Sequence, residues 1–288
     1  FDRFDVEAGV DLARVDHAMN NFDLRPEDTS PQRRESLTSA ETRSAHSSVS
    51  FAQFDGRLTL GLDVASETHD VRIVNPANVN FFVDAIPGAK IDRFGGFAQW
   101  RGKMSALESE LGLRIDHHSA DVGDAAIGSA LPAAPGMLAM NYNAADRNWD
   151  ATGVDAVARF WTPEKNGLSW RATLAHKTKA PGYLERFGWM PLSASGGLAD
   201  GNIYVGDLNL ELEKAWLAEA GFDYFGGQFY ARPTLFVRQI DNFVQGVPFD
   251  ETVGVIDTPQ EMIAAMSGDP TPLRFANVDA RLYGFDAD

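Results

Sequence analysis

The chain has 288 residues, with 25 Lys and Arg against 41 Asp and Glu, which gives a formal net charge of −16. This charge repels a phosphate backbone and attracts cations, so nucleic acid is not expected as a partner. The absence of cysteine excludes disulfides and thiolate metal sites within these residues, and no run of about 18 apolar residues is present that could form a membrane-spanning helix.

The chain opens with FDRFDVEAGV, which reads as the middle of a strand and shows no signal peptide, so we expect a fragment of something longer. Apolar residues alternate with polar ones from here onward, a period of two that is typical of β-strands. In 107–116, Leu107, Leu111 and Leu113 share one face, and Glu108, Glu110 and Arg114 share the other. Leu58, Leu60 and Leu62 form a second apolar face. These patterns predict an all-β chain.

About ten segments show this alternation. They are 3–18, 46–54, 57–70, 92–101, 107–118, 148–161, 168–178, 210–224, 228–244 and 274–286. Asp55-Gly56 is typical of a two-residue hairpin turn, and Pro233 should interrupt its strand because proline has no N–H to donate. The short connections alternate with long ones at 19–45, 71–91, 119–147, 179–209 and 245–273.

This order of long and short connections distinguishes two β architectures. A soluble sandwich has no reason to place every long loop at one end, whereas a transmembrane antiparallel β-barrel has short turns on one side and long loops on the other. We therefore predict part of a larger barrel, with the leucine faces toward lipid. Carboxylates on the other face, such as Glu108 and Glu110, could suggest a glycosidase. Solvated lumen groups explain them better, and no enzyme motif is present, so no enzyme activity is expected.

One segment carries a family resemblance. KAPGYLERF at 179–187, followed by GDLNLELE at 206–213, resembles the barrel signature of TonB-dependent outer-membrane receptors. Three stretches look like the copper-receptor branch of that family: VDHAMNNFDLR at 15–25, FGWMPLSASGGLADGNIYVG at 187–206 and GDPTPLRFANVDARLYGFD at 268–286.

The resemblance implies a location in the outer membrane of a Gram-negative bacterium, surrounded by its lipid. It also implies that residues 1–288 are one part of the barrel domain, about ten strands of roughly 22. A plug domain, the other strands and the N-terminal region that contacts the TonB complex would lie outside this chain. No cofactor is expected, and copper is the expected cargo.

The residues His17 and Met19 are the main candidate metal ligands. Counting along the first strand places both on the lumen face, just before a long loop. Imidazole and thioether suit Cu(I), and the resembled receptors use a His-x-Met at this strand end. The resemblance implies that the remaining ligands come from the plug, from a Cys-x-x-x-Met motif.

Other methionines, including Met137 and Met140, fall in long loops, where they could pass copper toward the rim or simply fill gaps in loop packing. Two alternatives to a copper receptor remain open at this point. One is a siderophore receptor, which would need an aromatic and arginine-lined cup, and the other is a passive porin-like barrel without a plug.

Overall fold

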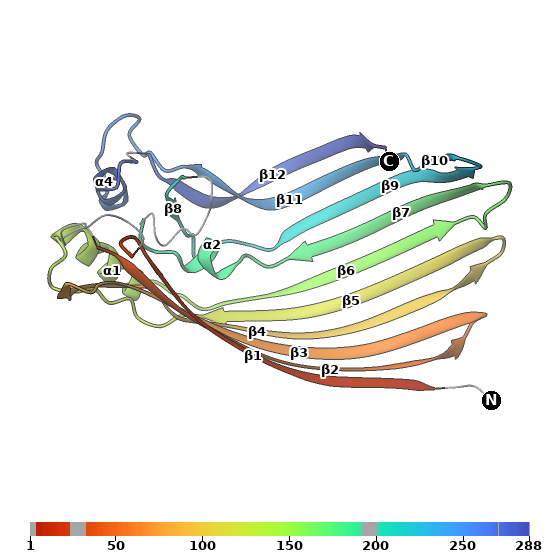
Figure 1. The fold of residues 1–288 in the computed structure, drawn as a ribbon, viewed down its shortest axis with the longest axis horizontal. Coiled ribbons are helices and arrows are strands. Elements are labelled where there is room, and N and C mark those ends of the chain that lie inside the picture. The colour runs from red at the N-terminus through yellow and green to blue at the C-terminus, as the bar shows by residue number, and fades with distance from the viewer. Residues whose placement is uncertain (1–3, 24–32, 192–200, 270, 288) are drawn as a thin grey trace.

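The structure, a computed structural model, describes residues 4–23, 33–191, 201–269 and 271–287. Within these residues the strands form one open, curved sheet in the order β1-β2-β3-β4-β5-β6-β7-β9-β11-β12-β8, with β10 paired to β9 (Figure 1). The long strands are antiparallel, and each pairs with its neighbour in the sequence. Their bounds are β1 Asp5–Asn20, β2 Glu35–Gln53, β3 Gly56–Asn75, β4 Asn78–Met104, β5 Leu107–Asp121, β6 Trp149–Trp161, β7 Leu168–Lys179, β9 Glu213–Gly226, β11 Thr234–Pro248 and β12 Leu273–Asp286.

Two further strands are very short. β8 (Tyr204–Val205) pairs in parallel with β12, and β10 (Phe229–Ala231) continues toward β11 after a break at 232–233. This break confirms the interruption that was predicted at Pro233, whose carbonyl accepts from the Phe222 N–H at 3.3 Å. The ten predicted segments therefore correspond to the ten long strands, with β10 and β11 sharing one of them.

The helices lie at one end of the sheet, together with the long connections and the two-residue β3–β4 turn, and the other tight turns lie at the opposite end (Figure 1). The helices are α1 (Ala133–Ala144), α2 (Tyr183–Phe187) and α4 (Pro259–Met266). No helix among the described residues is long and apolar enough to cross a membrane. We call the two ends of the sheet the loop end and the turn end.

Several predicted boundaries were wrong. β2 begins at Glu35 rather than at 46, and the supposed long link at 71–91 is mostly strand, because β3 and β4 continue to a two-residue turn at Pro76-Ala77. The predicted turn at Asp55-Gly56 is shifted by one residue. Phe54 and Asp55 occupy the turn, both with φ of 53°, while Gly56 pairs with Gln53. A Cβ on Gly56 would lie 2.4 Å from the Arg101 carbonyl oxygen, so Gly56 is required by close packing.

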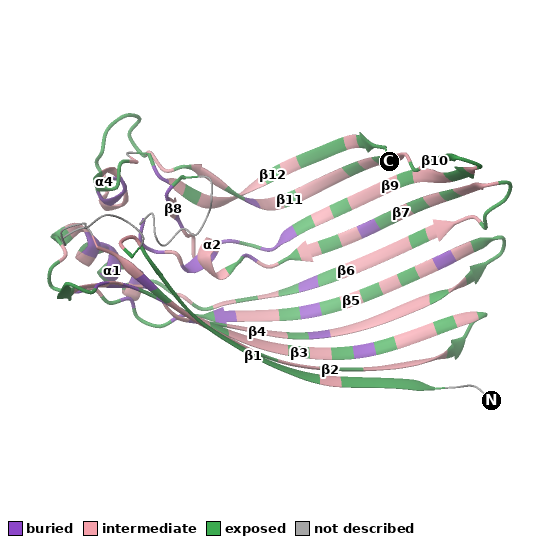
Figure 2. Ribbon diagram, in the orientation of Figure 1, coloured by how far each residue is buried: buried purple, intermediate pink, exposed green. Residues whose placement is uncertain are grey.

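The two faces of the sheet differ in polarity and exposure. The apolar face is the exposed one, which is the reverse of the arrangement in a soluble protein. Leu62 is 55% exposed and Leu113 is 50% exposed on one face, whereas Asp116 on the other face is only 9% exposed (Figure 2). The predicted leucine and charged faces are thus confirmed as opposite sides. We call them the outer face and the inner face. Exposed leucines over a wide sheet are typical of a surface that meets lipid.

Aromatic side chains mark the turn-end border of the outer face. Register places Phe51, Trp100, Phe160, Trp170 and Phe222 on this face near the turns. The six tryptophans of the chain are divided between the two faces and the loops. Trp100, Trp170 and Trp216 are on the outer face, Trp149 and Trp161 are on the inner face by register, and Trp189 is buried among the loops.

The buried apolar core lies at the loop end, on the inner face of the strands. We call it the loop cap. It combines Ile73, Val83 and Ile86 of β3 and β4 with side chains of α1, of 187–190 and of α4. Backbone bonds hold the segment 126–130 along β4, since Asp84, Gly128 and Ala130 donate to Ala126, Phe82 and Asn80 at 2.8 to 2.9 Å.

Candidate metal site at the loop end of the inner face

His17 and Met19 lie near the C-terminal end of β1. Their register with β2 is continuous: His17 faces Thr38 and Met19 faces Ser36. β1 then ends at Asn20, whose side-chain oxygen accepts from the backbone N–H groups of Phe22 and Asp23 at 3.2 and 2.9 Å. This local turn stops the strand one residue after Met19 and fixes the pair at the rim.

The face on which the pair lies can be followed across three strands. Met19 is paired with Ser36, Ser36 with Ile73, and Ile73 with Val83. Directly opposed residues in an antiparallel sheet point to the same side, and Ile73 and Val83 are fully buried in the loop cap. Met19 and His17 therefore lie on the inner face, as predicted.

The two side chains are available to a ligand. Met19 is 51% exposed, and His17 is exposed as well. Within the described residues, neither side chain makes a hydrogen bond, ion pair or ring contact, and no group of three His, Asp or Glu gathers to hold a metal. Residues i and i+2 on one strand face are roughly 7 Å apart at the backbone. The two candidate ligands are thus neighbours on one face of β1 at the rim.

The predicted loop methionines separate into two kinds. Met137 and Met140 lie on the exposed face of α1, opposite Leu138 and Tyr142, which pack into the loop cap. Met262 and Met266 are exposed on α4, and Met266 also lines a cavity of about 190 Å³ beside Met190. Met190 is only 2% exposed, so it is a packing residue. Met137 and Met140 lie on α1, which packs beside α4, whereas His17 lies on β1, which pairs with β2.

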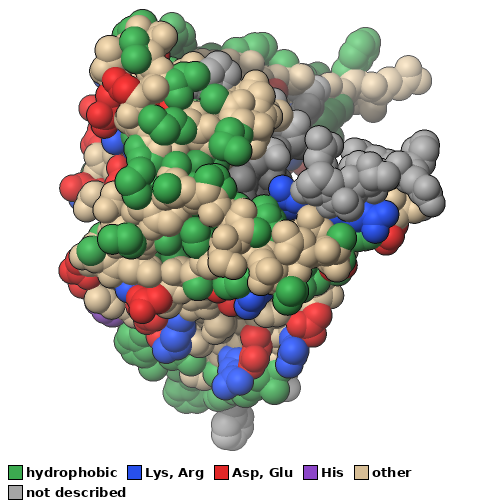
Figure 3. Space-filling view, turned by 90° about the vertical axis from the view of Figure 1, so that its left-hand side faces the viewer, with side chains coloured by type: hydrophobic (Ala, Val, Ile, Leu, Met, Phe, Trp, Pro, Cys, Tyr) green, Lys and Arg blue, Asp and Glu red, His purple; other side chains and the backbone are tan. Residues whose placement is uncertain are grey.

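Figure 3 views the molecule from the loop end. Apolar side chains gather in the upper half of this view, and acidic and basic side chains mix in its lower half. Exposed apolar side chains of the loops include Val253, Val255 and Ile256. The loop end therefore presents an apolar surface beside a charged one.

An ion-pair network covers the inner face below the rim. Arg114 donates to Asp63 at 2.8 and 2.9 Å and to Asp116 at 2.5 Å, and Arg93 lies 2.9 Å from Asp63. Similar pairs occur farther along the sheet: Arg159 with Glu110, Lys177 with Asp155, Arg171 with Asp223, and Arg238 with Glu219. These carboxylates are therefore neutralised by structural ion-pair partners.

The segment that carries the signature sequence forms a packed loop. The Arg186 guanidinium is 3% exposed, donates to the carbonyls of Leu208 and Leu210, and lies 4.5 Å from the Trp149 ring centre. Burial lowers the pKa of Arg186 to about 10, which leaves it charged at neutral pH. In the sequence, the burial of Arg186 is indicated locally by nothing more than the E-R-F run at 185–187.

A family model described as TonB dependent receptor-like, beta-barrel matches residues 2–288. The chain belongs to the TonB-dependent receptor β-barrel family. It is part of a barrel of the Gram-negative outer membrane, and the outer face described above is its lipid-facing surface. No curated protein sequence matches the chain.

Solved receptors share this fold. The copper transporter OprC is 20% identical, with a TM-score of 0.69, over 98% of this chain and 40% of that one. The ferric-catecholate import receptor Fiu from E. coli K12 is 14% identical, with a TM-score of 0.58, over 99% of this chain and 42% of that one. The ferric citrate transporter FecA is 10% identical, with a TM-score of 0.57, over 99% and 36%. The chain thus spans about two-fifths of the length of these receptors, and the likeness concerns the fold.

Proposed function

We propose that this receptor binds copper outside the cell and imports it with energy from the TonB complex. The observation that carries the proposal is the placement of His17 and Met19 on the inner face at the loop-end rim. A structure with the same fold is a copper transporter, OprC, which supports copper as the cargo. The receptor catalyses no reaction; it binds and releases its cargo.

The ligand types indicate the oxidation state. A thioether is a soft ligand that favours Cu(I), and the imidazole completes a pair that suits copper better than harder ions. Soft-metal sites normally have three or four ligands, and the described residues contain no group of three His, Asp or Glu that could hold a metal by themselves. In this proposal the other ligands come from a plug domain outside residues 1–288, which closes the site from the lumen side.

The exposed methionines on α1 have a subsidiary part in the proposal. Met137 and Met140 face solvent at the loop end, where a weakly bound Cu(I) would first meet the receptor. Single thioethers bind Cu(I) weakly, so these two residues would raise its local concentration without holding it. The net charge of −16 attracts cations toward the same region.

The test is the copper content of the purified full-length receptor, measured by mass spectrometry after loading with Cu(I). Met19→Ala and His17→Ala should each lower bound copper, and the double variant should abolish it. The matched controls are Met104→Ala at the turn end and His117→Ala on the outer face, which should leave the copper content unchanged. Full copper in the Met19→Ala and His17→Ala proteins would remove the pair from the site.

Iron-siderophore uptake is the competing outcome, because FecA and Fiu share the fold. A siderophore receptor would bind its iron complex equally well with and without His17 and Met19. Binding of a ferric siderophore by wild type, together with no copper retention, would replace the copper proposal with that function.

A further inference from the structure

Two asparagines, Asn20 and Asn21, directly follow Met19 in the sequence. Asn20 ends β1, as described above, and Asn21 has a different part. The Asn21 backbone N–H donates to the Arg34 carbonyl at 3.1 Å, and the Asn21 side-chain Oδ1 accepts from the Arg34 N–H at 2.8 Å. The two residues therefore exchange two hydrogen bonds just beyond the ends of β1 and β2. We call this pair the rim clamp.

In the rim clamp, the side chain of Asn21 takes the place of a backbone carbonyl. Residues that exchange both backbone hydrogen bonds recur at every second position of an antiparallel pair. Since Asn21 and Arg34 continue the register of β1 and β2, the next pair of this kind is Met19 with Ser36. The clamp thus closes the ladder one step beyond Met19, at a point where the backbone already leaves the sheet.

The rim clamp is connected to the buried core of the molecule. The Arg34 guanidinium carbon lies 3.9 Å from the centre of the Phe81 ring, and Phe81 of β4 packs against the loop cap. Through Arg34, the end of β1 is therefore tied to residues that are packed together rather than to another strand end in solvent.

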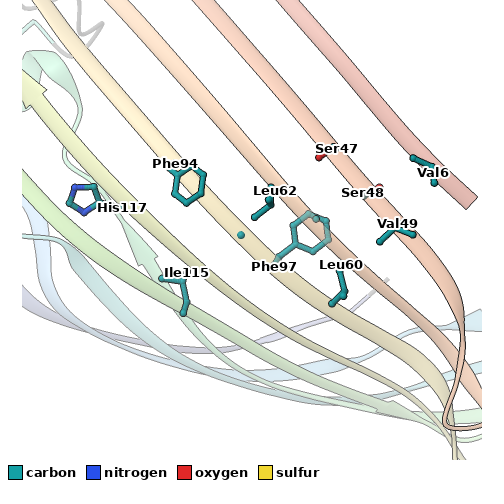
Figure 4. Close-up of a pocket in the computed structure, with 12 residues that line it drawn as sticks. Val6, Ser47, Ser48, Val49, Leu60, Leu62, Phe94, Phe97, Ile115 and His117 are labelled. Atoms are coloured by element: carbon teal, nitrogen blue, oxygen red, sulfur yellow. The ribbon is translucent and has the colours of Figure 1, made fainter.

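The turn half of β1 is held in another way, by apolar contacts on the outer face. Val6 lines a hollow on this face together with Val49 and Leu60, its neighbours in register (Figure 4). The continuous run of apolar positions on this face ends at Leu12 on β1 and at Val64 on β3. We call this apolar part of the outer face the lipid band.

The loop half of β1 lies above the lipid band, toward the loop end, and has no such support. Within the described residues, the side chains of 13–19 make no hydrogen bond, ion pair or ring contact to β2, and Arg14 pairs with Asp16 of the same strand at 3.0 Å. Strand ends whose backbone bonds are exposed to water open readily. Without the rim clamp, the pair of Met19 and Ser36 would be the last of the ladder and would open first.

We propose that Asn21 is a positioning residue of the copper site. It keeps the Met19 pair closed, so that the Met19 thioether and the His17 imidazole stay beside each other on the inner face. Asn21 does not touch the metal; it acts through the strand that carries the ligands. Ligands that are held in place before binding lose less conformational freedom when the metal arrives. This inference rests on the proposed function.

The experiment uses the full-length receptor in detergent, loaded with Cu(I), and follows the transfer of copper to a coloured Cu(I) chelator. Asn21→Ala should lower the affinity about fivefold, equivalent to about 1 kcal/mol, which is the net worth of one hydrogen bond. The loss should lie in faster copper release. Asn21→Asp keeps an Oδ acceptor for the Arg34 N–H and should restore slow release. An added charge at a rim acts mainly on association, so the release rate reports on the clamp.

The matched control is Asn78→Ala. The Asn78 Oδ1 accepts from the Asn80 N–H at 3.1 Å, so this variant removes the same kind of bond at the turn of the β3–β4 hairpin, away from β1. Its copper release should match that of wild type. Hydrogen exchange of 15–23 in the copper-free receptor should be faster in Asn21→Ala and unchanged in Asn78→Ala.

The outcomes separate this inference from the copper proposal. If the wild-type receptor holds no copper through His17 and Met19, both fall together. If wild type holds copper and Asn21→Ala releases it at the same rate, only the part assigned to Asn21 is overturned. Faster hydrogen exchange in Asn21→Ala without faster copper release would likewise overturn it, because the clamp would then support the strand and not the site.

Discussion

The Arg114 guanidinium on β5 crosses over Gly95 on β4 to reach Asp63 on β3, with its two Nη atoms 2.8 and 2.9 Å from the carboxylate oxygens. A Cβ on Gly95 would lie 2.2 Å from Arg114 Nη2 and 2.4 Å from Asp116 Oδ1. The glycine is therefore required so that one arginine can join three strands on the inner face.

Gly95→Ala should lower the free energy of unfolding by about 1–2 kcal/mol, because the Arg114 guanidinium must move and two partly buried carboxylates lose one of their two arginine partners. The estimate is kept small because a barrel lumen is wet. Urea unfolding of the receptor in micelles measures the change. Gly96→Ala, one residue away on the outer face, is the control and should stay within about 0.5 kcal/mol of wild type.

Adjacent residues of β5 should report opposite environments. The chain has no cysteine, so Leu111→Cys and Glu110→Cys each give one labelling position within it. A nitroxide at 111 should collide with oxygen dissolved in lipid, and one at 110 should collide with a water-soluble nickel complex. Electron paramagnetic resonance in bilayers measures both collision rates. The same preference at the two positions would contradict the assignment of faces.

Arg186→Lys should loosen the loop between β7 and β9. A lysine cannot donate in the same fork to the carbonyls of Leu208 and Leu210, nor lie flat over Trp149. Limited proteolysis should cut this loop faster by about an order of magnitude, from a local loss of roughly 1.4 kcal/mol, while the barrel stays folded. Arg147→Lys is the control, because Arg147 pairs with the exposed Asp124. Equal cleavage rates for the two variants would show that Arg186 does not hold the loop.

The helix α4 should respond to acid through Glu261. Its carboxylate accepts from the Thr258 hydroxyl at 2.7 Å and from the backbone N–H groups of Thr258 and Asp257, and these bonds, led by the hydroxyl, hold the pKa of Glu261 below its usual range. A lowered carboxyl pKa stabilises the fold above about pH 4.5 and loses that effect as the pH falls further.

Hydrogen exchange of 257–268, corrected for the intrinsic pH dependence, should therefore show protection that falls as the pH drops below about 4.5. Glu261→Gln should reduce protection at neutral pH and remove most of this step. Asp250→Asn, in the connection just before α4, is the control and should keep the step. An unchanged step in Glu261→Gln would assign the acid response to another group.

The strands could be predicted from the sequence where they cross the lipid band, but several of their bounds toward the loop end were predicted wrongly. Within the band, most outer positions are apolar and most inner ones are polar, so Leu58 to Val64 alternate clearly. Above it the two faces exchange character, because Arg72 points outward while Ile73 packs into the loop cap. Bulges between His69 and Arg72 also break the period. In this region the alternation has reversed polarity and is interrupted by extra residues. It cannot be recognised from the sequence unless one knows that the loop cap covers the inner face.

The candidate site could likewise be predicted from the sequence only in part. The face of His17 and Met19 could be predicted because β1 has an unbroken register with β2 over its whole length. The burial of Met190 and Arg186 could not, since it depends on loops far apart in the sequence that pack together at one end.

The β3–β4 hairpin continues from Val64, at the border of the lipid band, to its turn at Pro76-Ala77. These dozen residues span about 36 Å along the strand, or roughly 28 Å of height at a strand tilt of about 40°. The mouth of the receptor on this side therefore opens among the surface sugar chains, well above the phosphates of the membrane. An antibody raised against the turn would therefore reach its epitope on intact cells.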